Sequence, residues 1–136
     1  MRINPYLSFN GDCEAAFRLY EKVLGGRITM MMTFGESPMA SEVPPERRLL
    51  ILHTTLAVGD SLLQGADVPP GTYQKPQGTS VTISLDDAAH AERVFRALAE
   101  GGTVQMPLQH TFWARRFGMV TDRFGTPWLI NCGNPQ

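Results

Sequence analysis

Apolar residues recur along the chain with two different spacings, and these spacings predict where strands and helices lie. An extended apolar segment covers residues 3–9, and an Asn-Gly-Asp triplet with turn chemistry follows it. Asp12 is well placed as the N-cap of a helix. Apolar side chains then recur every three or four residues over 13–24, and a Gly-Gly pair supplies a C-terminal stop. The chain therefore begins with a strand and an amphipathic helix.

The same order of elements occurs twice. Three further strands are predicted in the first half, at residues 27–34, 46–59 and 61–66. The second half repeats the pattern with a strand at 80–85, a helix that starts at 88 after Asp86 and Asp87 and stops at Gly101 and Gly102, and strands at 103–110, 115–122 and 126–133. Each half is thus βαβββ, although residue identity between the halves is weak.

This order predicts an α+β fold made of two βαβββ modules in a single domain, residues 1–136. The first module covers about residues 1–66, a Pro- and Gly-rich linker covers about 67–77, and the second module covers about 78–136. The polar segment 35–48 joins two strands, and a surface loop is favoured there over a mobile flap.

Composition narrows the class of protein. The 12 Lys and Arg residues and 13 Asp and Glu residues give a formal charge of −1, without a basic run, so a nucleic-acid partner is not expected. The start lacks a secretory leader, and no apolar run approaches the roughly 18 residues of a membrane span. We therefore expect a cytoplasmic protein with no membrane partner, in which Cys13 and Cys132 are free thiols.

Three stretches resemble a known family. They are PYLSFNGDCEAAFRLYEKVLGG at 5–26, LHTTLAVGDSLL at 52–63, and TFWARRFGMVTDRFGTPWLIN at 111–131. Together they resemble the vicinal oxygen chelate superfamily of glyoxalases, ring-cleaving dioxygenases and bleomycin-resistance proteins, and within it the PhnB-like branch. The resemblance implies eight strands curled into cups around a pocket, with the helices outside, and a homodimer in which a partner subunit completes the cups.

The positions that hold a metal in other members of this family can be tested in this sequence. The resemblance implies His, Glu or Gln ligands on the first and last strands of each module, but the matching positions are Pro5, Gln64, Ser80 and Leu129. One amide cannot replace the three protein ligands of a typical catalytic zinc site. We therefore expect neither a catalytic metal nor another cofactor, since a Gly-rich phosphate loop after a strand is also missing.

Other candidate groups each have a structural alternative. His53 lies in a predicted strand and either faces the pocket or is an ordinary hydrogen-bonded strand histidine, which is favoured. His110 could point to the cup, whereas His90 on the second helix is expected in solvent. Asp122 could be an acid, but its setting DRFG favours a turn in which it accepts from backbone N–H groups.

The aromatic stretch at 110–131 is predicted to be mainly a core hairpin. The resemblance implies that Leu129 faces the cup, and strand alternation then places Trp128 beneath a helix. Trp113 lies at the entry to a strand, where a structural role and a functional role have equal weight. Arg115 and Arg116 alternate faces, so one of them could bind an anionic group in the cup; the sequence does not say which.

The leading hypothesis is a metal-free protein that binds a small organic ligand in a partly aromatic cup, with catalysis left open. The alternative is a metal-dependent lyase, isomerase or dioxygenase of the glyoxalase type, with His53, Gln64 or His110 as replacement ligands. Strand parity, counted from the family's ligand positions, and the aromatic stretch give the expected pocket residues. They are Pro5, Leu7, Phe9, His53, Gln64, Ser80, Thr82, Ser84, Phe112, Trp113 and Leu129.

Overall fold

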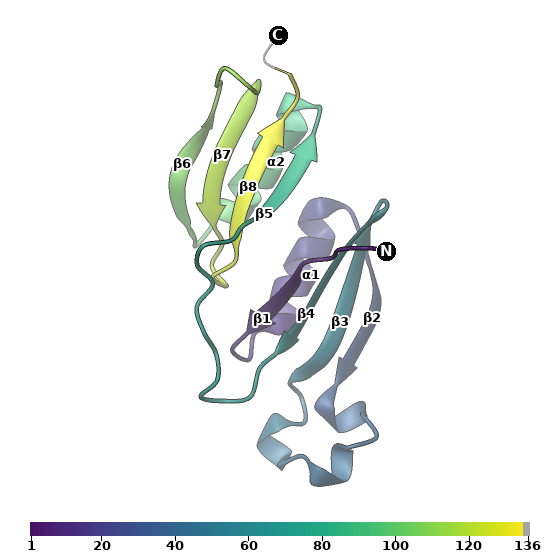
Figure 1. Cartoon of the computed structure of the whole chain (residues 1–136). Coiled ribbons are helices and arrows are strands. Elements are labelled where there is room, and N and C mark those ends of the chain that lie inside the picture. Colours follow the sequence, from purple (N-terminus) through teal and green to yellow (C-terminus); the bar gives the residue numbers. More distant parts are fainter. Residues whose placement is uncertain (135–136) are drawn as a thin grey trace. The chain divides into compact units, whose positions relative to one another are not determined.

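The computed structural model describes residues 1–134. Two long helices and eight strands follow one another in the predicted order, together with three short 3₁₀ helices (Figure 1). Their bounds are β1 Tyr6–Phe9, α1 Cys13–Leu24, β2 Arg27–Thr33, η1 Phe34–Glu36, η2 Ala40–Glu42, η3 Pro45–Arg47, β3 Ile51–Val58, β4 Ser61–Asp67, β5 Val81–Leu85, α2 Ala88–Ala99, β6 Thr103–Gln109, β7 Arg116–Thr121 and β8 Pro127–Cys132.

The chain divides into two compact units, Met1–Gln74 and Lys75–Gln136. Each unit is one βαβββ module with a four-stranded mixed sheet, in the order β1-β4-β3-β2 in the first and β5-β8-β7-β6 in the second. The first and last strands of each module pair in parallel, and the other pairs are antiparallel. One helix packs on one face of each sheet (Figure 1). The α+β class and the two-module architecture predicted from the sequence are confirmed.

The core of the first unit lies between α1 and its sheet. Phe17 of α1 is fully buried and makes an edge-to-face contact with Phe9 of β1, with ring centroids 5.9 Å apart. Gly65 of β4 leaves the space for this ring, since a Cβ there would lie 2.6 Å from a Phe17 ring carbon. The helix face of this sheet is therefore the one that carries Phe9 and Gly65.

Asp12 does not cap α1 as predicted, because its side chain makes no capping hydrogen bond. The carboxylate of Asp67, at the end of β4, takes that place. Its Oδ1 accepts from the backbone N–H groups of Gly11 and Cys13 at 2.9 and 3.1 Å. Its Oδ2 accepts from the N–H of Ile51 at 2.8 Å, so one buried carboxylate joins the helix start to β3.

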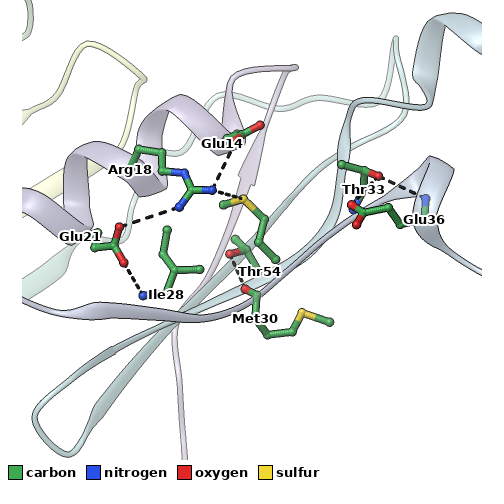
Figure 2. Close-up of polar contacts among 9 residues, drawn as sticks. Glu14, Arg18, Glu21, Ile28, Met30, Thr33, Glu36 and Thr54 are labelled. Carbon is green, nitrogen blue, oxygen red and sulfur yellow. Dashed lines mark hydrogen bonds and ion pairs between the residues drawn. The ribbon is translucent and has the colours of Figure 1, made fainter.

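A β-bulge in β2 changes which of its side chains face α1. Ile28 pairs with Leu56, but Met30 pairs with Thr55, so one extra residue lies between them. The hydroxyl of Thr54 donates to the carbonyl oxygen of Met30 at 2.8 Å and holds this irregular stretch (Figure 2). Because side chains alternate along a strand, one extra residue moves Met30 to the face opposite the helix.

The start of β2 is also joined to α1. Glu21 of the helix accepts a hydrogen bond from the backbone N–H of Ile28 at 2.7 Å, and Arg18 lies between Glu14 and Glu21 at 3.5 and 3.9 Å (Figure 2). These ion pairs are solvent-exposed and contribute little to stability. The Glu21 side-chain hydrogen bond joins the start of β2 to the helix, beside the bond from the N–H of Gly26 to the Glu21 carbonyl oxygen at 3.2 Å.

The core of the second unit lies between α2 and its sheet. Trp128 and Ile130 of β8 are buried, and Gly118 of β7 lies so close to Phe95 of α2 that an added Cβ would be 2.8 Å from its ring. The side chain of Asp87 caps the helix by accepting from the N–H of Ala89 at 3.1 Å. The predicted packing of Trp128 beneath a helix and the predicted cap are both confirmed.

The three 3₁₀ helices lie mainly in the segment predicted as a surface loop, and the strand predicted at 46–59 begins later, at Ile51. Thr33 and Glu36 form a reciprocal capping box at the start of the first 3₁₀ helix, in which each side chain accepts from the other residue's backbone N–H (Figure 2). This hydrogen bonding lowers the pKa of the Glu36 carboxyl. Both long helices have 12 residues, and no helix within residues 1–134 has the length and apolar character needed to cross a membrane.

Candidate ligand-binding faces

Each sheet has a second face, opposite its helix, which we call its open face. In the first unit, one register row crosses the sheet from Tyr6 through Gln64 and Thr55 to Met30. His53 and its partner Met32 lie on the same face because they are two residues from Thr55 and Met30. The first open face therefore combines four hydrogen-bonding side chains with two thioethers.

His53 connects two of these groups. Its Nδ1 lies 3.1 Å from the phenol oxygen of Tyr6, and its Nε2 lies 3.2 Å from the hydroxyl oxygen of Thr55. The Tyr6 and His53 rings are tilted with centroids 5.6 Å apart. Tyr6 is 51% exposed and His53 is partly buried. Burial raises the pKa of Tyr6, so its phenol is protonated over the ordinary pH range.

The register predicted for the first strand is wrong by one residue. Leu7 pairs with Gly65, and Phe9 is buried against Phe17, so both lie on the helix face rather than in a pocket. Pro5 precedes β1 and is exposed, with its carbonyl oxygen accepting from the N–H of Gln64 at 3.1 Å. Tyr6 is the residue of this strand that lies beside Gln64 and His53.

In the second unit, Thr82 and Ser84 pair with Leu129 and Asn131. Their neighbours Val81 and Ile83 pair with Trp128 and Ile130, which are buried on the helix face. The open face therefore carries Thr82, Ser84, Leu129 and Asn131. Ser80 precedes β5 and is exposed. It lines a hollow of about 350 Å³ together with Met119, Thr121, Pro127 and Gln105 among others.

One buried oxygen on this face has an unused hydrogen-bonding capacity. The side-chain Oδ1 of Asn131 is buried and has no hydrogen-bond partner within the described part of the chain. Asn131 pairs with Ser84 on one side and with Phe117 on the other. Leaving a buried acceptor unpaired costs free energy, so this position is suited to a molecule that brings an N–H or O–H group.

The exposed aromatics form a chain next to Phe117. Trp113 contacts Phe117 with ring centroids 5.1 Å apart and contacts Phe112 at 4.7 Å, both with steeply tilted rings. Phe112 is 86% exposed and Trp113 is 45% exposed. The structure thus places Trp113 at the margin of the second open face, and Phe112 beyond it.

The two arginines bind to the protein itself. Arg116 pairs with Cys132, which is on the helix side, and its Nε lies 3.6 Å from Glu92 of α2. Arg115 donates from Nη2 to the carbonyl oxygen of Asp86. These contacts do not support an anion-binding role for either guanidinium on the open face.

Asp122 is part of the turn between β7 and β8. Its Oδ1 accepts from the N–H groups of Phe124 and Thr126 at 2.9 and 3.0 Å, and its Oδ2 accepts from the indole N–H of Trp128 at 2.9 Å. The carboxylate is buried. These contacts agree with the turn role favoured from the sequence.

The available side chains do not fit the metal site of the wider family. No group of three or more His, Cys, Asp or Glu residues between Met1 and Asn134 is placed to hold a metal ion. His53 has hydroxyl groups at both ring nitrogens, while His90 and His110 are exposed. Metal binding at His53 would have to displace Tyr6 or Thr55.

Sequence reasoning missed Tyr6, Thr55 and Asn131. A signal existed for Thr55 and Asn131, because they are two residues from His53 and Leu129 and share their strand faces. Tyr6 was hidden by the register error. Met30 depends on the bulge, for which the run RITMMMT offers no local signal.

Comparison with known proteins agrees with this architecture. The chain belongs to the Glyoxalase/Bleomycin resistance protein/Dioxygenase superfamily, whose profile matches residues 2–130. The resemblance noted from the sequence is confirmed at this level.

Several relatives match over nearly the whole chain. Protein YjdN from Escherichia coli (strain K12) is 32% identical over 144 residues, which cover 100% of this chain and 98% of that protein. The crystal structure of PA1353 from Pseudomonas aeruginosa is 47% identical, with a TM-score of 0.90 and 98% of both chains covered. A PhnB protein from Bacillus cereus has a TM-score of 0.83 and covers 98% of this chain and 100% of its own, but at 20% identity it shows a shared fold alone.

Proposed function

We propose that this protein binds a small organic molecule on the open faces of its sheets, as a PhnB-like member of the superfamily that works without a resident metal. The observation behind this proposal is the first open face, where Tyr6, His53 and Thr55 are hydrogen-bonded side by side next to Met30 and Met32. A few oriented polar groups on an apolar bed are typical of small-molecule sites.

The second unit supports the same function. Ser80, Thr82, Ser84 and Leu129 supply the second open face in this proposal, and the hollow beside Ser80 has the size of known small-molecule pockets. The unpaired Oδ1 of Asn131 adds an acceptor there. Trp113 and Phe112 would provide aromatic contact at the margin.

The rival function is a metal-dependent lyase, isomerase or dioxygenase. It requires at least three protein ligands around the metal, drawn from residues such as His53, Gln64 and His110. The hydroxyl groups at both nitrogens of His53 weigh against this function.

Elemental analysis and a melting-shift screen test the proposal together. We expect purified protein to contain far less than one divalent metal ion per chain, and we expect some small organic compounds to raise its melting temperature equally with and without a chelator. Stoichiometric metal, or a chelator that abolishes every shift, would contradict the proposal and favour the rival.

A bulky substitution locates the binding. Ser80→Phe should fill the hollow of the second unit and reduce ligand-induced melting shifts with little change in the unliganded melting temperature, because Ser80 is exposed. Ala89→Phe, at an exposed position near the start of α2, is the control and should keep the shifts. Equal shifts in both variants would remove this hollow from the proposal.

The proposal includes a homodimer and a cytoplasmic location. Cell fractionation with an antibody against the native protein tests the location, and recovery in a membrane or periplasmic fraction would contradict it. The dimer is argued below at the scale of the whole molecule.

A further inference from the structure

The three side chains on the first open face form a hydrogen-bonded relay, defined here as Tyr6, His53 and Thr55. Its two contacts, at 3.1 and 3.2 Å, occupy both nitrogens of the imidazole. A neutral imidazole has one N–H donor and one acceptor nitrogen, so it cannot accept from both neighbours or donate to both. The relay therefore has a direction, with a different hydrogen-bonding capacity at each end.

The acidities of the two hydroxyls decide that direction. A phenol is more acidic than an aliphatic hydroxyl, which makes Tyr6 the better donor and the poorer acceptor of the two. Tyr6 then donates to Nδ1 of His53, and the Nε2–H of His53 donates to the hydroxyl oxygen of Thr55. The phenol oxygen of Tyr6 keeps a lone pair for an incoming donor, and Thr55 keeps its own hydrogen for an incoming acceptor.

The surroundings of the relay define the rest of the ligand. Gln64 lies between Tyr6 and Thr55 in the register row and offers an uncharged amide, and Met30 continues the row on the other side of Thr55. None of these four side chains carries a formal charge when Tyr6 is protonated, and His53 is also uncharged in the neutral form that gives the relay its direction. An ionised ligand group would lose water here without gaining a counter-charge from this row, which is unfavourable.

We propose that the relay recognises an uncharged organic molecule that presents one hydrogen-bond donor and one acceptor on an apolar body, as a primary amide on a ring does. This inference rests on the proposed function, because it assigns a ligand class to the first of the two open faces. The donor of the ligand meets the Tyr6 oxygen or the Gln64 amide oxygen, its acceptor meets the Thr55 hydroxyl, and its apolar body lies on Met30 and Met32.

Three compounds of similar shape test the ligand class with the full-length protein. Benzamide has the donor and acceptor, benzoate has a charge in the same place, and toluene has neither. We expect benzamide to shift the NMR signals of the Met30 and Met32 methyl groups and of the His53 ring nitrogens, with an affinity at least about tenfold higher than that of the other two. Its affinity should change little with salt, because no ion pair is involved.

Variants of the relay test the assignment of the residues. Thr55→Val keeps the shape of the side chain but removes the hydroxyl, and Tyr6→Phe removes the phenol oxygen. Each should weaken benzamide binding about five- to tenfold, the usual effect of losing one hydrogen bond. Thr55→Ser should retain the affinity. Thr103→Val, the same change at an exposed position in the second unit, should leave it unchanged.

The His53 nitrogen signals test whether Thr55 sets the tautomer of the relay, and benzamide affinity tests recognition. Thr55→Val should move the ring nitrogen signals of the unliganded protein, and Thr55→Ser should restore them, because the tautomer depends on the hydroxyl. Benzoate binding as tight as benzamide binding, unchanged benzamide affinity in Thr55→Val, or no benzamide binding would each overturn the relay. The proposed function would survive these results if other compounds still raised the melting temperature of the metal-free protein.

Discussion

Asp122 shows how much a single residue can organise in this fold. Its buried carboxylate accepts from two backbone N–H groups and from the indole of Trp128, so both oxygens are used. Asp122→Asn replaces one oxygen by an NH₂ group, which must face a donor in either orientation. We expect the variant to lose about 1.5–3 kcal/mol of unfolding free energy, the usual range for hydrogen bonds to a charged group.

Chemical denaturation measures this loss, and Asp60→Asn is the matched control. Asp60 is exposed in the turn between β3 and β4, where such a change should stay within about 0.5 kcal/mol. Equal losses in the two variants would mean that the hydrogen bonds of Asp122 do not stabilise the turn.

The buried thiol of Cys13 predicts how the stability of the protein changes with pH. Burial first, and then the nearby Asp67 carboxylate, raise the pKa of this thiol above its ordinary value. A group with a raised pKa in the folded state contributes stability below its unfolded pKa, about 8.5 for a cysteine, and this contribution is lost as the pH rises. The unfolding free energy should therefore decrease between about pH 8.5 and pH 10, as measured by denaturation at a series of pH values.

The Cys13→Ala variant isolates this effect from those of other groups that titrate in the same range. Its unfolding free energy should decrease less steeply over that interval, even if it is lower throughout because a buried sulfur has been removed. Parallel pH profiles for the variant and the wild type would assign the alkaline loss to other residues.

The residue scale also shows what the sequence could not predict. The turn role of Asp122 was accessible because its backbone partners are two and four residues away. The cap of α1 was not, because Asp67 is 56 residues from Gly11 and 54 from Cys13. A local pattern names a suitable neighbour such as Asp12, whereas the folded chain brings a distant carboxylate to the same N–H groups.

At the scale of elements, both Gly-Gly pairs end a helix and let the chain pass close to a strand. The first glycine of each pair, Gly25 or Gly101, has a φ of 70° or 75° in the left-handed region that ends a helix. The second glycine, Gly26 or Gly102, lets the backbone pass close to β3 or β7. A Cβ on Gly26 would lie 2.5 Å from the carbonyl oxygen of Ala57, and one on Gly102 would lie 2.2 Å from that of Thr121.

Substitution of the second glycines should therefore disrupt packing against backbone that cannot easily move. We expect Gly26→Ala and Gly102→Ala each to cost about 1–3 kcal/mol or more, as overpacked sites do. Gly25→Asn is the control, because Asn tolerates left-handed backbone and nothing lies within 4 Å of a Cβ there. Urea denaturation compares the three, and a larger loss for Gly25→Asn than for Gly26→Ala would contradict this account.

The order of helices and strands was predictable from the sequence. Which side chains lie on which face of a sheet was predictable only in part. In the second module, parity counted from the family's ligand position put Thr82 and Ser84 on one face and Val81 on the other, and the strand pairing has the same division. In the first strand, Tyr6, Leu7 and Phe9 put bulky side chains on both faces, so the pattern could not choose between them. The bulge at Met30 then shifted β2 by one residue, and the open face gained the two methionines beside His53.

At the scale of the whole molecule, the two units have the same architecture, and each leaves one face of its sheet without a helix. Each covers one face of a four-stranded sheet with a 12-residue helix. Element order predicted the two βαβββ units, and the family resemblance implied the helix on the outer side of each sheet. The open face of the first sheet was not predictable, because its composition depends on the register of β1 and on the bulge in β2.

These open faces and their margins carry large apolar side chains that water contacts. Tyr6 is 51% exposed, Met30 38% and Trp113 45%. Layered folds normally cover both faces of such sheets, and exposed apolar patches mark surfaces that associate. A second copy of the chain is the partner that the family resemblance implies, and two-fold dimers are the commonest way in which identical chains associate.

We therefore predict a two-fold dimer at tens of micromolar protein, measured as molar mass by light scattering after gel filtration. The melting temperature should rise with protein concentration, since dimer formation stabilises the folded chain by mass action. Met30→Glu should shift the mass toward the monomer, because a carboxylate buried in an apolar contact without a partner costs several kcal/mol. Lys22→Glu, at an exposed position on α1, adds negative charge away from the open face and should leave the dimer intact. A monomer over this whole concentration range would contradict the prediction.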